Sequence, residues 1–153
     1  MKPLPIFSAC LAIALCCAQD ATPQSKVYRS VANDRLEKIL QSLALKYEKA
    51  ERKDKDTTIV FYEFKRGDQS YRLYNYVNDL WIESTFEKTM KPEQVNRWNA
   101  DAKFSRLVLV AQKDRTFLSL ESQLDCLGGV TDAMIKQYIV RFDEEAKKFA
   151  TFK

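Results

Sequence analysis

The sequence predicts an α+β domain in which an antiparallel sheet is covered by an N-terminal and a C-terminal helix. Apolar residues recur at three- and four-residue steps around residue 40 and again after residue 131. The stretches between them alternate apolar and polar residues, as half-buried strands do. Such a sheet needs helices to cover one of its faces. The expected order of elements is α-β-β-β-α-β-β-α.

The first 18 residues are predicted to be a signal peptide. Lys2 supplies a short positive region, Leu4 to Leu15 is almost wholly apolar, and residues 16–18 place small side chains before Gln19. The apolar run is shorter than the roughly 20 residues that a membrane span requires. An uncleaved anchor, a cytoplasmic extension and a lipoprotein are the alternatives. We expect cleavage near Ala18 and a periplasmic or secreted product without a membrane span.

The mature chain is predicted to be one domain behind a short tether. Residues 19–30 are polar, contain Pro23 and lack any period, so they are expected to be flexible. Residues 31–153 are long enough to bury a single core.

Composition excludes several classes of function. The chain has 25 basic and 21 acidic side chains, a mild excess that does not indicate a nucleic-acid surface. It has no histidine, so Ser-His-Asp and Cys-His nucleophilic systems and histidine-ligated zinc are unavailable. Three of the four cysteines lie in the predicted signal peptide, which leaves Cys126 either buried or paired between chains.

The first helix is predicted from one apolar stripe, formed by Leu36, Ile39, Leu40, Leu43 and Tyr47. Asn33 or Ser30 can cap its start. The charged stretch 46–56 is expected to end the helix in a solvated loop.

Three strands are expected next, at Thr57 to Phe64, Gln69 to Val77 and Leu80 to Phe86. Turn signals at residues 66–68 and 78–79 separate them. Consecutive strands joined by such short turns form an antiparallel meander.

A short helix and a hairpin are expected after the meander. Pro92 suits the first turn of a helix that carries Val95 and Trp98 on one side. The two hairpin strands are predicted from alternating residues, Ser105, Leu107, Leu109 and Ala111 in one and Leu118, Leu120, Ser122 and Leu124 in the other.

The last helix has the most regular pattern. Thr131 can cap its start. Its broad apolar stripe is expected to pack on the sheet and consists of Met134, Ile135, Tyr138, Ile139, Phe142, Ala146 and Phe149.

From about residue 34 to 152, this order of elements resembles the YbjN family, described as bacterial sensory transduction regulators with a fold like that of type III secretion chaperones. The residues that carry the resemblance are Trp98, Asn99, Phe104, Arg106, Gly128 and Gly129. Trp98 can anchor the short helix, Asn99 can end it or hydrogen-bond the adjacent turn, and the glycines permit backbone angles closed to other residues. The resemblance implies an architecture and dimerisation through a sheet or helix face. It implies no catalytic residue.

Aromatic side chains crowd the first three predicted strands, at Tyr62, Tyr74, Tyr76 and Trp81. Aromatic residues among basic ones can stack nucleic-acid bases, but they also form the centres of protein interfaces. Export and the weak net charge disfavour nucleic acid. We therefore expect whichever of these side chains face away from the helices to bind a protein partner.

Glutamates in the strands raise the alternative of an enzyme. Glu63, Glu83 and Glu121 lie mid-strand and two of them could converge as an acid and a base. Solvated strand faces ordinarily carry such residues. We expect no catalytic residue, no cofactor and no metal site.

The predicted function is that of an exported, non-enzymatic interaction or chaperone-like module in the bacterial envelope, with an unidentified protein partner or a second copy of itself. One alternative is a small-ligand binding protein with a pocket between the sheet and the C-terminal helix. Another is the sensory transduction regulator that the family label suggests.

Overall fold

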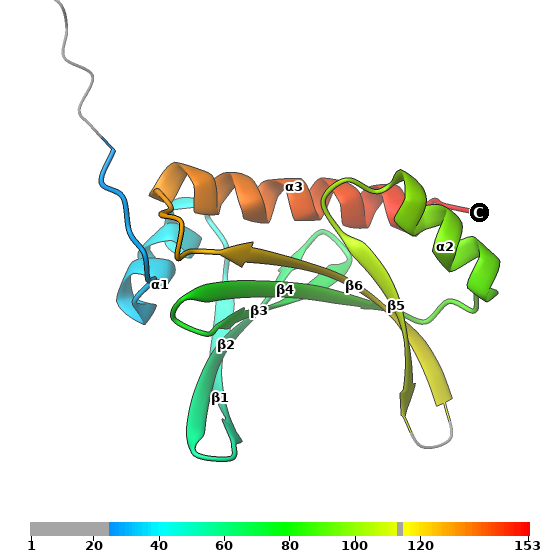
Figure 1. The fold of residues 1–153 in the computed structure, drawn as a ribbon, viewed down its shortest axis with the longest axis horizontal. Coiled ribbons are helices and arrows are strands. Elements are labelled where there is room, and N and C mark those ends of the chain that lie inside the picture. The colour runs from blue at the N-terminus through cyan, green and yellow to red at the C-terminus, as the bar shows by residue number, and fades with distance from the viewer. Residues whose placement is uncertain (1–24, 113–114) are drawn as a thin grey trace, which may run out of the picture.

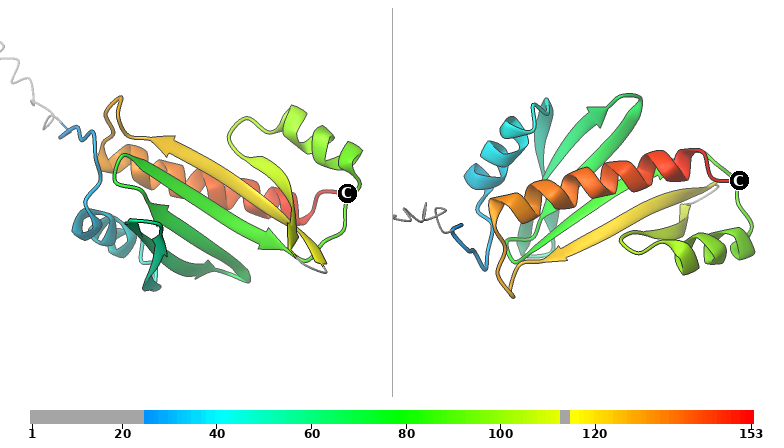
Figure 2. Two further views of the ribbon diagram at one scale, coloured as in Figure 1. Left: turned by 60° about the horizontal axis from the view of Figure 1, so that its bottom comes forward. Right: turned by 90° about the horizontal axis from the view of Figure 1, so that it is seen from above.

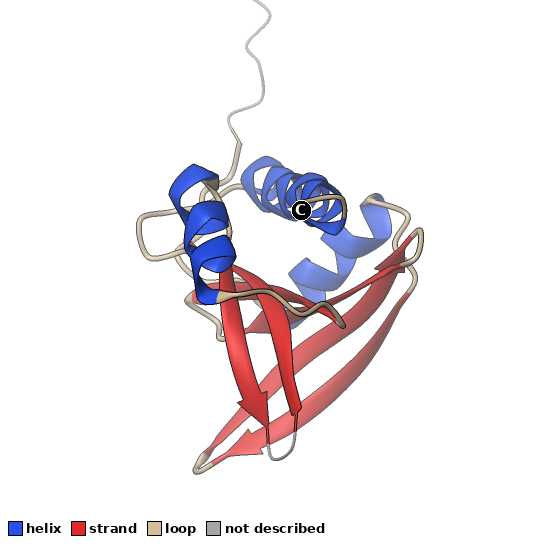
Figure 3. Cartoon of the chain, turned by 90° about the vertical axis from the view of Figure 1, so that its right-hand side faces the viewer, coloured by secondary structure: helices blue, strands red, loops and turns tan. Residues whose placement is uncertain are grey.

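A six-stranded antiparallel sheet forms the centre of the molecule, with three helices on one of its faces (Figures 1 and 3). The computed structural model describes residues 25–112 and 115–153. Its strands are β1 (Tyr47–Asp54), β2 (Thr57–Arg66), β3 (Gln69–Asn75), β4 (Asp79–Phe86), β5 (Arg106–Gln112) and β6 (Arg115–Asp125). Its helices are α1 (Asn33–Ser42), α2 (Pro92–Asp101) and α3 (Asp132–Ala150). The predicted signal peptide, residues 1–18, lies outside the described residues.

The sheet is arched. Its strand order is β1-β2-β3-β4-β6-β5. Figure 1 shows the β1–β2 and β5–β6 hairpins bending away from the helices at the two ends of the sheet. From above, α3 runs along the middle of the sheet between α1 and α2 (Figure 2). The arch leaves a concave sheet face that none of the three helices covers.

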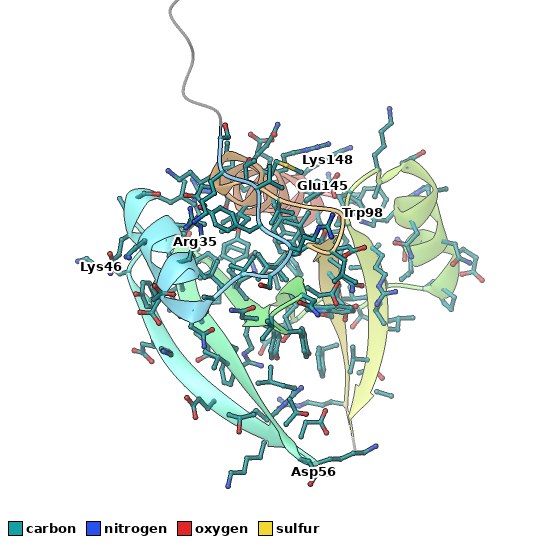
Figure 4. The ribbon with its side chains drawn as sticks, turned by 60° about the vertical axis from the view of Figure 1, so that its left-hand side comes forward. Arg35, Lys46, Asp56, Trp98, Glu145 and Lys148 are labelled. Atoms are coloured by element: carbon teal, nitrogen blue, oxygen red, sulfur yellow. The ribbon has the colours of Figure 1, made fainter. Side chains whose placement is uncertain are left out.

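The core lies between the sheet and the helices, where side chains fill the space (Figure 4). Strand alternation places one set of residues on this side, including Tyr62, Leu73, Leu80, Ile82, Leu118 and Leu120. The apolar stripe of α3 packs against them through Ile135, Ile139, Phe142 and Phe149. Burial of these side chains is the main favourable term for the fold, at about 1.5–3 kcal/mol for each large residue.

The predicted α+β class, antiparallel sheet and covering helices are confirmed. The starts of two helices also agree with the sequence. The Thr131 hydroxyl accepts the Met134 N–H at 3.2 Å, and Pro92 occupies the first turn of α2. The start of α1 differs, because Ala32 precedes it and no side chain caps it.

One strand was missing from the predicted order. The first helix ends at Ser42, before Tyr47, and most of the charged stretch 46–56 is the edge strand β1. Ala44, with a positive φ of 54°, reverses the chain between the helix and the strand. Tyr47 still reaches the core, where its ring packs edge-on to Tyr62 at 5.4 Å. The charges of β1 concealed it, because edge strands commonly carry charges and lose the alternating pattern.

The chain before α1 is attached to the domain. Residues 25–30, the described part of the predicted tether, include Tyr28, which exchanges two backbone hydrogen bonds with Val130 at 2.8 and 2.7 Å. The Tyr28 ring lies against the guanidinium of Arg35, 3.6 Å from its centre. Arg35 in turn binds the Asp132 carboxylate through two hydrogen bonds, which join α1 to the start of α3.

The residues that carry the family resemblance have structural roles. Trp98, which is labelled in Figure 4, is 2% exposed and packs edge-on against Phe149 of α3 at 5.0 Å. Phe104 packs against Tyr138 at 5.6 Å. Gly129 has a φ of +98°, whereas Gly128 does not require the left-handed conformation. The predicted freedom of the backbone is thus needed at Gly129.

Cys126 is buried, in agreement with its interpretation as a small apolar residue. Burial raises the pKa of its thiol to about 11, with a smaller effect from the nearby Asp79 and Asp125 carboxylates. A thiol that is buried and protonated is a poor nucleophile.

Candidate functional site

The sheet face opposite the helices, called here the open face, is the candidate site. Its side chains come from alternate positions of every strand, and they lie in rows because the strands pair in a defined register. Two neighbouring rows differ in chemistry. One is charged and the other is aromatic.

The charged row crosses the whole sheet. In register order it consists of Glu48 of β1, Glu63 of β2, Arg72 of β3, Glu83 of β4, Glu121 of β6 and Arg106 of β5. Each arginine thus stands beside a glutamate of the neighbouring strand. Opposite charges directly across a strand pair stabilise it modestly, by roughly 0.2–1 kcal/mol.

Arg72 is the centre of this row. Its Nε donates to Glu63 Oε1 at 2.7 Å, and its Nη1 lies 3.4 Å from Glu83 Oε1. The Tyr74 hydroxyl donates to the same Glu83 oxygen at 2.9 Å. Burial lowers the pKa of the Arg72 guanidinium, but its hydrogen bonds to Tyr74 and Glu63 outweigh this effect and raise that pKa overall. The network therefore holds a fixed positive charge among neutralising carboxylates.

The aromatic row lies beside the charged row. Phe61 of β2, Tyr74 of β3 and Trp81 of β4 are cross-strand partners. The Phe61 and Tyr74 ring centres are 5.5 Å apart, and Tyr76 stacks on Tyr74 at 6.1 Å. Aromatic contacts of this kind contribute about 0.5–1.5 kcal/mol beyond area burial. The rings of this row thus pack on one another across the strands.

A hollow of about 280 Å³ lies beside Trp81, at the start of β5. Its wall includes Lys103, Phe104 and Gln123. The guanidinium of Arg106 is 5.0 Å from the centre of the Trp81 ring and binds Glu121 at 3.2 Å. The hollow is smaller than the roughly 300–1,000 Å³ of typical small-ligand pockets.

The four aromatic residues predicted for a partner surface are not all on the open face. Tyr74, Tyr76 and Trp81 lie there, and of these Tyr76 is the most exposed, at 40%. Tyr74 is only 6% exposed because its neighbours cover it. Tyr62 points to the opposite side of the sheet, where it is fully buried and donates to Glu37 at 3.2 Å. Tyr62 is therefore excluded from this surface.

Residues that the sequence did not assign to a binding surface complete the open face. Phe61 was not distinguished from a core residue, and Arg106 and Arg72 were not recognised as the partners of strand glutamates. The pairing of the two arginines with glutamates depends on the strand register. The signal available in the sequence was the alternation of β2, which places Phe61 and Glu63 on one face.

Two of the glutamates considered for acid–base chemistry are neighbours. Glu83 and Glu121 are cross-strand partners, and Glu63 lies beyond Arg72 on the same row. Each of the three carboxylates is within 3.4 Å of an arginine nitrogen. The described residues contain no group of three or more acidic or cysteine side chains placed to hold a metal ion.

A larger hollow of about 860 Å³ opens where β2 ends and β3 begins. Its walls include Lys46, Tyr47, Glu63, Lys65, Arg72 and Thr85. No residue of α3 contributes to it, so it is not the expected pocket between the sheet and the C-terminal helix.

Across residues 25–112 and 115–153, no helix is both long and apolar enough to cross a membrane.

Comparison with known proteins finds similarity at the level of the fold. The structure is similar to the crystal structure of YbjN from E. coli, described as a candidate transcription regulator, with a TM-score of 0.58. The alignment covers 76% of this chain and 86% of YbjN at 15% sequence identity. The chain has a YbjN-like fold. No family model and no curated protein sequence matches it.

Proposed function

We propose that this YbjN-like domain is an exported interaction module that binds a protein partner through its open face. The observation that carries the proposal is an aromatic row, Phe61, Tyr74 and Trp81, on a sheet face that no helix covers. Phe61 and Trp81 are partly exposed and Tyr76 beside them is exposed, and aromatic residues dominate the energetics of protein interfaces.

The hollow beside Trp81 supports the same proposal. Its volume of about 280 Å³ suits one or two side chains of a partner rather than a complete ligand. Binding hot spots are commonly aromatic residues and arginines around such a depression, and Trp81 and Arg106 supply both. The surrounding charged row would form the polar rim that orients the partner.

The charges of the open face favour a protein over nucleic acid. The charged row holds four glutamates and two arginines, an acidic balance that repels phosphate groups. YbjN itself is described as a candidate transcription regulator. For this chain, we expect any regulatory role to act through a protein, without salt-dependent binding of duplex DNA.

Site-specific photo-crosslinking in the producing cell tests the surface. A photoreactive phenylalanine analogue replaces Trp81 or Tyr76 on the open face, or Met134 on α3, which is 45% exposed. We expect a discrete adduct with one partner from positions 81 and 76 and none from position 134. Equal labelling from position 134, or no adduct from the open face, would contradict the proposal.

Export is tested separately from the binding surface. The predicted signal peptide, with Lys2 before the apolar run 4–15, motivates it. We expect the protein recovered from a periplasmic or secreted fraction to begin near Gln19 by intact-mass measurement. A full-length cytoplasmic product would overturn the proposed compartment and leave the open face to be judged by its own experiment.

A further inference from the structure

The two free edges of the sheet differ in their protection against pairing. The β1 edge carries charged side chains at six of its positions, Glu48, Lys49, Glu51, Arg52, Lys53 and Asp54. Charges on an edge strand prevent it from adding a further strand. The β5 edge, Arg-Leu-Val-Leu-Val-Ala-Gln, has Arg106 as its single charged residue. The β5 edge therefore lacks the usual protection.

Hydrogen bonds from α2 reveal which peptide groups of β5 point outward. The Leu107 N–H donates to Asn99 Oδ1 at 2.7 Å, and the Leu107 carbonyl accepts from Asn99 Nδ2 at 3.0 Å. Both groups must therefore point away from β6. Because direction alternates along an antiparallel strand, the peptide groups of Leu109 and Ala111 point outward too. Within residues 25–112 and 115–153, no hydrogen bond to these groups is found.

We propose that β5 pairs antiparallel with β5 of a second copy of this chain, around a two-fold axis at Val110. In this register, Leu109 of each copy lies opposite Ala111 of the other. The outward N–H and carbonyl groups of both residues are then all paired. Since the same patch serves both copies, the assembly closes as a dimer.

The side chains of β5 are complementary to themselves in this register. The two copies of Val110 face each other on the open face of the sheet, and Leu109 faces Ala111 on the other side. No like charges meet. Leu109, now 38% exposed, becomes covered. An extended segment of another protein could satisfy the same peptide groups, but it would not be symmetric about Val110.

Asn99 determines how far the pairing extends. A register shifted toward Leu107 would meet peptide groups that the Asn99 amide already occupies. Pairing is thus limited to Leu109 and Ala111 of each copy. Such an interface is small, so we expect a concentration-dependent dimer of the weak class. This surface is separate from the proposed partner site, although the paired sheets would make the two open faces continuous.

Engineered disulfides test the register directly. At the two-fold axis the Val110 Cα atoms would be about 4.5 Å apart, within the range of a disulfide. The Val108 Cα atoms would be about 14 Å apart, although Val108 shares the strand and face of Val110. We therefore compare V110C with V108C in the full chain, with Ser at positions 10, 16 and 17. Cys126 is retained because it is buried.

The expected result is a covalent dimer of V110C under mild oxidation and little or none of V108C. Sedimentation equilibrium of the otherwise unmodified chain provides a second measurement. Val110→Lys should weaken association roughly tenfold or more, because it places two like charges opposite each other. Ala50→Lys on the β1 edge is the matched control and should leave association unchanged.

Several results would overturn the proposal. These are a protein that remains monomeric at all concentrations, a dimer unaffected by Val110→Lys, and equal crosslinking of V108C and V110C. A monomer whose β5 amides are protected from hydrogen exchange would also overturn the dimer, because the edge would then be paired within one chain. Circular dichroism of each variant separates loss of pairing from loss of folding.

Discussion

The side chain of Asn99 binds both outward backbone groups of Leu107, accepting the N–H at 2.7 Å and donating to the carbonyl at 3.0 Å. A side-chain amide has the same donor and acceptor groups as a peptide. Asn99 thus takes the place of a neighbouring strand at the start of β5. This contact joins α2 to the sheet edge.

Replacement of Asn99 by Ala should lower the free energy of unfolding by about 1–2 kcal/mol, because two hydrogen bonds are lost at a partly solvated edge. Asn96→Ala on the same helix is the matched control, since it makes the same change in helix propensity at an exposed position. Urea unfolding monitored by circular dichroism measures both. Equal stability of the two variants would show that the Asn99 contact contributes nothing.

Asp143 is a buried carboxylate, and we expect its removal to be strongly destabilising. It accepts the Tyr71 hydroxyl at 2.7 Å and pairs with Lys147 at 2.8 Å and Arg66 at 3.2 Å. Asp143→Ala should cost about 3–5 kcal/mol, because it leaves the half-buried Arg66 charge without its partner.

The control for Asp143 is its exposed neighbour Glu144. Glu144→Ala should change the unfolding free energy by less than about 0.5 kcal/mol. Tyr71→Phe removes one hydrogen bond of the cluster and should cost about 1–2 kcal/mol. If Asp143→Ala changed the unfolding free energy as little as Glu144→Ala, the ion pairs of Asp143 would make no net contribution to stability.

Gly129 and Gly128 form a natural pair for comparison. A Cβ at Gly129 would lie 2.7 Å from Val27 Cγ1, and its φ of +98° is strained for other residues. Gly129→Ala should therefore destabilise the protein by about 1–3 kcal/mol. Gly128→Ala should be nearly neutral, because nothing lies within 4 Å of its added Cβ.

The two causes at Gly129 can be separated by a second change. Val27→Ala combined with Gly129→Ala removes the steric clash but retains the backbone strain, so it should recover only part of the loss. Hydrogen exchange at Tyr28 would follow the attachment of the N-terminal segment. Full recovery would indicate that the backbone conformation itself carries no penalty.

Stability should decrease at alkaline pH because of buried tyrosines. Burial raises the pKa of Tyr138 above its ordinary value of 10, and its hydroxyl lies 2.7 Å from the Ser122 carbonyl. The unfolded chain therefore ionises first as the pH rises. The contribution of Tyr138 is complete below about pH 10 and is lost progressively above it.

Urea unfolding between pH 8 and pH 11 measures this effect. Tyr138→Phe should reduce the loss of stability over that interval, while lowering stability at every pH through its missing hydrogen bonds. Tyr76→Phe, at an exposed position, is the control and should leave the pH dependence unchanged. An identical slope for Tyr138→Phe and the unmodified chain would contradict the assignment.

Local patterns predicted much of the fold. The stripe of α3 and the Thr131 cap are readable because a helix repeats within a few residues and buries one face. The meander was equally readable, since alternation and turns are local signals. The strand β1 was not, because an edge strand has one neighbour and tolerates charges at positions that a central strand would make apolar.

The candidate site was predicted only in part. The sequence indicated aromatic residues in the first strands, and alternation separates Tyr62 from Phe61 within β2. It could not decide which of the two faces the helices, because a period of two fixes only relative faces. Helix packing makes that choice, and it buries Tyr62 while leaving Phe61 and Trp81 on the open face.

The sequence by itself determined the α+β class, the core stripe of α3 apart from Met134, which is 45% exposed, and the absence of histidine chemistry. These depend on composition and on periods a few residues long. Only the tertiary structure decided that Arg72 and Arg106 join four glutamates in one row, and that Asn99 occupies the edge at Leu107. Such relationships depend on strand register and helix docking, which bring together residues distant in the chain, so no local pattern contains them.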